Sequence, residues 1–171
     1  MFKKGNAMTG FIIVLLSIAA SLTIALRHGR PRRDALQLYA TQHHFQLHRE
    51  RNYDFIQQNL LPTLHTTGTH HYAQNILTNA THTLCDYHLE LPTHTQPQSH
   101  HFHLILTHQP HSTSVLHINQ QPVSDLQPLL LELINGTQPY LELQEKNTRA
   151  HLYSGPLNPE KLPTQLQQFK A

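Results

Sequence analysis

The chain has 171 residues, of which 38% are hydrophobic and 13% are charged, and its formal net charge is +2. This length predicts one domain with short additional segments. A single cysteine excludes an intramolecular disulfide and a four-cysteine zinc module. Residues 52–144 contain no lysine or arginine, and a nucleic-acid interface needs such cations, so we do not expect nucleic acid as a partner.

Residues 8–26 are apolar and carry no charge. As a helix they would extend about 28 Å, close to the hydrocarbon thickness of a bilayer. Two basic residues, Lys3 and Lys4, precede this segment. Four follow it, namely Arg27, Arg30, Arg32 and Arg33. This bias predicts a transmembrane helix with the rest of the chain in the cytoplasm. The same arginines can contact anionic lipid headgroups, which makes the bilayer an expected partner.

The chain is therefore expected to have four parts. A short tail covers residues 1–7, a transmembrane helix covers 8–26, and a basic juxtamembrane segment covers 27–33. One soluble domain covers 34–171. Its first element is a short helix, because Asp34 can cap it and Leu36, Tyr39, Ala40 and His43 recur at helical spacing.

The rest of the soluble domain alternates with a period of two, which is typical of strands. Strand-like alternation begins at 45–48, and further strands are expected at 71–78, 83–91, 101–107 and 113–119. A helix is expected over 124–136, where Ser124 or Asp125 can cap its start and Asn135-Gly136 can close it. A hairpin turning at Lys146-Asn147 and a terminal helix capped by Asn158 follow. The predicted fold class is α+β, with an N-terminal transmembrane helix followed by an antiparallel β-meander and one or two packed helices.

Histidine is unusually frequent, with 17 residues. In a hairpin of 84–91 with 100–107, burying the apolar residues together places polar side chains on the opposite, solvent-facing side. One register puts His88 opposite His103 and Glu90 opposite His101, at about 5.5 Å between Cβ atoms. His88, Glu90, His101 and His103 are thus candidate ligands for Zn²⁺ or Cu²⁺. The alternative is an ordinary wet strand face on which histidine replaces other polar residues.

We predict no enzymatic activity and no catalytic residues. Neither nucleophile motifs nor a glycine-rich phosphate loop occurs. Cys85 is expected to point into the core, where a thiol is unreactive. Asp86 and Glu90 could form an acid–base pair, but an open strand face offers no pocket that would separate their pKa values. Histidine protonation near pH 6.5 also allows a pH-sensing role, as an alternative to compositional drift.

The order of motifs resembles a group of uncharacterised single-span bacterial membrane proteins. In them a helix leads to a glycine-containing loop, then to an Asn-led strand and to an "FDY-x-Y"-like strand. Gly68, Asn75, Asp86 and Tyr87 match that order, and "PYLELQEKNTRAHLYSGPLNPEKL" is similar to their closing unit of two strands and a helix. Leu84-Cys85 and His88-Leu89 depart from the aromatic pattern. The resemblance implies a bacterial source and an architecture, and it implies no activity.

The sequence "KKGNAMTGFIIVLLSIAA" is similar to a type IV pilin leader, with Gly10-Phe11 at the processing site. Leu15 stands where pilins have glutamate, and the arginines after the apolar segment would have to be exported. We therefore expect a non-enzymatic interaction or scaffold domain with an unknown protein partner at the bacterial inner membrane. The alternatives are a histidine-rich metal-buffering protein and a minor pilin-like protein.

Overall fold

A computed structural model of the chain describes residue 14 and residues 31–59, 62–93, 96–118, 121–122 and 125–168. The chain forms two compact units, residues 1–38 and 39–171. Residues 31–42 are helical, which agrees with the expected helix. Three residues of this helix have buried side chains, namely Leu36, Tyr39 and Ala40. The ring of Tyr39 stacks on Phe45 just beyond the helix, with centroids 6.0 Å apart.

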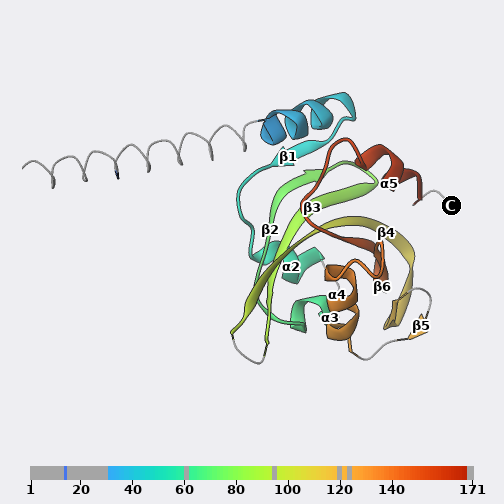
Figure 1. Cartoon of the computed structure of the whole chain (residues 1–171). Coiled ribbons are helices and arrows are strands. Elements are labelled where there is room, and N and C mark those ends of the chain that lie inside the picture. Colours follow the sequence, from blue (N-terminus) through green and yellow to red (C-terminus); the bar gives the residue numbers. More distant parts are fainter. Residues whose placement is uncertain are drawn as a thin grey trace, which may run out of the picture. The chain divides into compact units, whose positions relative to one another are not determined.

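The second unit is built on an antiparallel sheet of six strands (Figure 1). The strands are β1 (Gln46–His48), β2 (Thr69–Thr78), β3 (His82–Leu91), β4 (Gln98–Ile118), β5 (Gln121–Pro122) and β6 (Leu141–Ser154). Their order is β1-β2-β3-β4-β5, and β6 also pairs with β4. The four helices labelled in Figure 1 are short, namely α2 (Asp54–Asn59), α3 (Pro62–Thr66), α4 (Gln127–Ile134) and α5 (Leu162–Gln168).

The predicted fold class needs correction. The structure is a six-stranded antiparallel sheet with few helices, in place of an α+β fold that begins with a transmembrane helix. In the part of the chain that the structure describes, no helix is long and apolar enough to cross a membrane. A bilayer span needs about 20 apolar residues, and α2 to α5 have at most eight. The single-pass membrane description therefore has no support from the described residues.

Several residues of that prediction lie outside the described residues. These are residues 8–26, apart from Val14, together with Arg27 and Arg30. Arg32 and Arg33 belong to the helical residues 31–42. The cytoplasmic side and the inner-membrane location depend on the same segment, and they stay predictions.

The expected strands 101–107 and 113–119 are joined in the long strand β4, and the loop expected at 108–112 lies within it. β6 includes both arms of the expected hairpin. Its two halves contact each other, because Glu142 bonds to Arg149 at 2.7 Å and the rings of Tyr140 and His151 lie 4.8 Å apart. Residues 140–151 fully extended would span roughly 36 Å, so β6 is strongly curved. The hairpin predicted at Lys146-Asn147 is wrong, because both residues lie inside β6, which pairs with β4 from Leu143 to Ser154.

The main hydrophobic core lies on one face of the sheet. It contains Cys85, Tyr87 and Leu89 of β3 and Phe102 and Leu104 of β4, as the predicted alternation requires. The helices add Phe55 from α2, Leu64 from α3, and Leu130 and Leu133 from α4. The cap predicted at Ser124 or Asp125 is wrong, because the N-cap residue of α4 is Leu126 and it makes no side-chain cap hydrogen bond. Asp125 accepts a hydrogen bond from the Gln127 amide, and Asn158 accepts one from the Glu160 amide in the turn before α5.

β2 carries two irregularities in its pairing with β3, one between Thr69 and Tyr72 and one between Gln74 and Leu77. A left-handed residue lies within each of them, His70 at φ 51° and Asn75 at φ 49°. Such residues are typical of β-bulges, which redirect neighbouring side chains. Just before β2, Gly68 has φ +84°, and a Cβ at this position would lie 2.4 Å from the carbonyl oxygen of Glu90.

We expect Gly68→Ala to destabilise the domain by about 2–4 kcal/mol, because it adds a backbone clash to left-handed strain. Gly136→Ala is the matched control, since Gly136 has φ +74° but a Cβ there meets nothing within 4 Å. The Gly136→Ala substitution should lower the free energy of unfolding by only about 1–2 kcal/mol. Urea unfolding of both variants measures the difference, and equal losses would contradict the close approach to Glu90.

Candidate functional site

The predicted metal ligands lie on β3 and β4, which pair in a register different from the predicted one. His88 lies opposite His101, whereas the predicted register places it opposite His103. Glu90 lies opposite Ser99. The prediction is wrong by two residues along the strand. A shift by an even number keeps every side chain on its face, so these residues still share one side of the sheet.

The four predicted ligands do not converge on one point. The rings of His88 and His101 lie 4.9 Å apart, centroid to centroid. Glu90 instead contacts Nδ1 of His70 at 2.9 Å, and His103 bonds to a different part of the chain. Within the described ranges, no group of three or more histidine, cysteine, aspartate or glutamate side chains is arranged to hold a metal ion.

The face that carries these residues is largely buried, and the expectation of a wet face is wrong there. Asp86 and His103 are each only 4% exposed, and His151 is 1% exposed. Residues 155–168, which include α5, contact this face through the hydrogen bonds described below. We call residues 155–168 the cover segment. Buried polar groups need hydrogen-bond partners, so the contacts of this segment decide what the face can do.

Asp86 connects three parts of the chain. Its carboxylate accepts a hydrogen bond from the Asn75 side chain at 2.6 Å and another from the Leu157 backbone amide, also at 2.6 Å. Asn75 reaches Asp86 from the second irregularity of β2, and Leu157 belongs to the cover segment. Hydrogen bonds to a carboxylate are among the stronger ones in proteins. Asp86 thereby attaches both β2 and the cover segment to β3.

His103 is held in one neutral tautomer. Its Nδ1 lies 3.0 Å from the carbonyl oxygen of Gly155, which can only accept, so Nδ1 carries the proton. Nε2 then accepts a hydrogen bond from the Gln165 amide at 3.1 Å. Burial lowers the pKa of His103, which favours this neutral form over the smaller opposing effects of its hydrogen bonds.

Four rings lie in a continuous row beside the cover segment. His103 stacks on Tyr153 at 4.8 Å with nearly parallel planes, Tyr153 lies 5.5 Å from Tyr140, and Tyr140 lies 4.8 Å from His151. Burial lowers the pKa of His151 to about 4, although the nearby Glu142 opposes the shift. Burial likewise raises the pKa of Tyr153 to about 12. His103, His151 and Tyr153 are therefore uncharged at neutral pH.

A cavity of about 510 Å³ lies between this row and α5. We call it the α5 pocket. Its lining residues are His103, Pro139, Tyr140, Tyr153, Ser154, Glu160, Lys161, Thr164, Gln165 and Gln168. Oε1 of Gln165 is buried and has no hydrogen-bond partner among the described residues. The volume is within the usual range of ligand sites, about 300–1,000 Å³.

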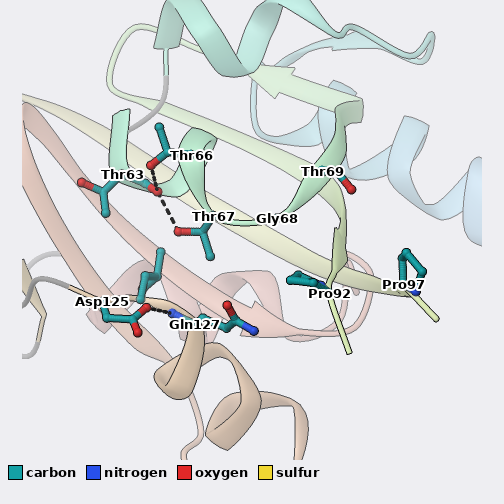
Figure 2. A pocket seen from close by; sticks show the side chains of 10 residues that line it. Thr63, Thr66, Thr67, Gly68, Thr69, Pro92, Pro97, Asp125 and Gln127 are labelled. Atoms are coloured by element: carbon teal, nitrogen blue, oxygen red, sulfur yellow. Dashed lines mark hydrogen bonds between the residues drawn. The ribbon is translucent and has the colours of Figure 1, made fainter. Parts of the chain in front are cut away.

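A second cavity, of about 500 Å³, lies between α3 and the start of α4 (Figure 2). Its polar groups serve the local structure. The hydroxyls of Thr66 and Thr67 both donate to the Thr63 carbonyl, and Asp125 accepts from the Gln127 amide. A third cavity, of about 600 Å³, is lined by residues around Arg51 and Tyr53. Neither cavity contains a row of rings like that of the α5 pocket.

Cys85 and Tyr87, two side chains with nucleophilic potential, are shielded from solvent. Cys85 is fully buried, and burial raises the pKa of its thiol. Tyr87 is also buried, with its hydroxyl 2.7 Å from Nδ1 of His71 and 3.4 Å from the Leu64 carbonyl. A buried thiol with a raised pKa is unreactive. These contacts give both residues a structural role.

Comparison with protein-family models, with curated proteins and with solved structures finds no match to this chain. The resemblance to single-span bacterial membrane proteins stays a prediction. The four residues that carry it each have a structural explanation, since Gly68 approaches Glu90, Asn75 donates to Asp86, and Tyr87 is buried.

Most residues that line the α5 pocket could not have been predicted as neighbours from the sequence. The alternation in residues 149–155 places His151 and Tyr153 together opposite the core residues Ala150 and Leu152, so these two could have been paired as a polar face. Gln165 could not have been found, because nothing in its local sequence indicates that it bonds to His103, 62 residues away.

We expect His88→Phe to stabilise the domain by about 1–2 kcal/mol. Nδ1 of His88 is buried without a hydrogen-bond partner among the described residues, and such a group costs about 1–3 kcal/mol. Phenylalanine keeps an aromatic ring packed against Tyr72, since the ring centroids of Tyr72 and His88 lie 4.5 Å apart. His101→Phe is the control, because His101 is exposed, and it should change stability by no more than about 0.5 kcal/mol. Urea midpoints at pH 7.5 measure both effects, and a destabilised His88→Phe variant would contradict the explanation.

Acidification should destabilise the domain through His151. Its pKa is about 4 in the folded state, whereas an unfolded histidine titrates near 6.5. Between these values the unfolded chain binds more protons, so stability falls as the pH drops from 6.5 towards 4, by roughly 3 kcal/mol. His151→Phe keeps the ring and removes this titration. Urea unfolding at pH 7.0 and 4.5 should show a smaller loss for the variant, and an equal loss would exclude His151 as the cause.

Proposed function

We propose that residues 39–171 form a non-enzymatic recognition domain that binds a planar ring of its partner in the α5 pocket. The observation that carries the proposal is the row of rings in which His103, Tyr153 and Tyr140 line a cavity of ligand size. Ligand sites are typically concave and ring-lined, with few polar groups that fix orientation. A planar group gains both apolar burial and ring–ring contact there.

The polar groups of the α5 pocket support binding that is oriented as well as apolar. Lys161 and Glu160 line one side and offer a cation and an anion next to each other. The Gln165 amide already donates to His103, while its oxygen has no partner among the described residues. A ring that carries an N–H or O–H group can pair with such acceptors, as the indole of tryptophan does.

The same contacts argue against chemistry at this site. A general base needs a free nitrogen near the reacting group, and both ring nitrogens of His103 are used in hydrogen bonds. Raised pKa values keep Tyr153 and Cys85 protonated. The residues near Gly10 that suggested a pilin-like protein lie outside the described residues. No contact in the described part of the chain favours a pilin-like role or general metal buffering.

Fluorine NMR of the full chain with 3-fluorotyrosine tests the proposal. The chain has six tyrosines and no tryptophan, so six signals report on different places. Indole and the capped tripeptide acetyl-Gly-Trp-Gly-amide are the probes, and they distinguish a free ring from a peptide side chain. We expect the signals of Tyr140 and Tyr153 to shift on titration, while those of Tyr39 and Tyr53 stay in place.

Tyr140→Ala should weaken probe binding about tenfold, which corresponds to ~1.4 kcal/mol. Tyr53→Ala is the matched control, since Tyr53 is 58% exposed and lies outside the α5 pocket, and it should leave the affinity unchanged. If neither probe moves the Tyr140 and Tyr153 signals, or if both variants weaken binding equally, the α5 pocket is not the recognition site.

A further inference from the structure

Two of the predicted metal ligands do lie together. His88 of β3 and His101 of β4 are directly opposite each other in the antiparallel pair. Opposed side chains in such a pair have Cβ atoms about 4.5–5.5 Å apart. Their ring centroids lie 4.9 Å apart and the planes are tilted by 54°. Tilted rings at this separation can direct one nitrogen each towards a common point.

The pair includes one buried nitrogen without a hydrogen-bond partner in the described part of the chain. Nδ1 of His88 has no hydrogen-bond partner among the described residues, although His88 is only 8% exposed. Burial and the neighbouring His101 lower the pKa of His88, so its imidazole is neutral at pH 7, as metal binding requires. His101 is exposed and gives access from solvent.

The surroundings hold the pair in place. Tyr72 of β2, which lies opposite His88, stacks on it from the other side at 4.5 Å. Arg51 lies 4.6 Å above the Tyr72 ring and opposes a bound cation, whereas Glu90 favours one. Glu90 contacts His70, and the His70 side chain is 75% exposed, which leaves it room to change its rotamer.

We propose that His88 and His101 bind one divalent transition-metal ion of the copper or zinc class through one nitrogen of each ring. Imidazole nitrogen suits both ions, and Cu²⁺ binds such sites more tightly than Zn²⁺. His103 has no part in this site, because both of its nitrogens bond to the cover segment. The site is separate from the α5 pocket and does not depend on ring recognition there.

The other close histidine pair is less suitable. His65 and His71 stack at 5.5 Å with planes only 27° apart, and Nδ1 of His71 bonds to the Tyr87 hydroxyl. Near-parallel rings direct their nitrogens side by side instead of towards one point. A chain with 17 histidines also offers many single exposed imidazoles, so a test has to locate the ion as well as detect it.

Paramagnetic broadening locates the ion. The full chain with 3-fluorotyrosine is titrated with Cu²⁺ below one equivalent, and the fluorine lines are recorded. Broadening falls with the sixth power of distance from the ion, so the Tyr72 line should broaden first. An ion at His65 and His71 would broaden Tyr87, and one at His43 would broaden Tyr39, whose ring is 4.4 Å from it. Excess Zn²⁺ should restore the Tyr72 line if it competes for the same site.

His101→Ala should weaken Cu²⁺ binding at Tyr72 at least tenfold, and His88→Phe should abolish it. The matched control is His100→Ala, because His100 is the neighbour of His101 on the opposite face and lies opposite Leu89. This variant should keep the selective broadening. Six lines that broaden together, a Tyr72 line that stays sharp, or an unchanged response of His101→Ala would each overturn the proposal.

Discussion

The carboxylate of Asp86 is buried between the sheet and the cover segment, and much of the second unit depends on its hydrogen bonds. A buried charge without donors would be strongly unfavourable. Asn75 and the Leu157 amide supply the donors, each at 2.6 Å. The first contact uses an irregularity in β2, and the second fixes the start of the cover segment. With the cover segment in place, Gly155 and Gln165 reach His103 and complete its hydrogen bonds.

The alternation of apolar and polar side chains along β3 and β4 was predictable from the sequence. The register in which the two strands pair was not. The core face of β3 and β4 follows from the period of two, and the structure confirms Tyr87 and Phe102 on that face. Registers that differ by two residues bury the same apolar side chains, so alternation cannot choose between them. In the observed register Asp86 lies opposite His103. Both residues bond to the cover segment, whose position a local pattern does not reveal.

The burial of the second face was missed for a related reason. The cover segment is rich in proline and glutamine and has little apolar periodicity. It is nevertheless anchored by Leu157 and Leu162, which are both fully buried, and by its bonds to Asp86 and His103. Two apolar side chains and a few hydrogen bonds are too sparse a signal to read from sequence. Histidines assigned to solvent therefore lie inside the protein.

The extent of the cover segment explains why neighbouring histidines differ. His103 lies beneath it and His101 lies two residues away, about 6–7 Å along the same strand and on the same face. His103 gains a carbonyl, an amide and a stacked tyrosine, and both of its nitrogens are bonded. The His101 side chain is exposed, and its ring lies 4.9 Å from that of His88 across the strand pair. One face of one sheet thus offers a ring-lined cavity where α5 covers it and the exposed imidazole of His101 where it does not.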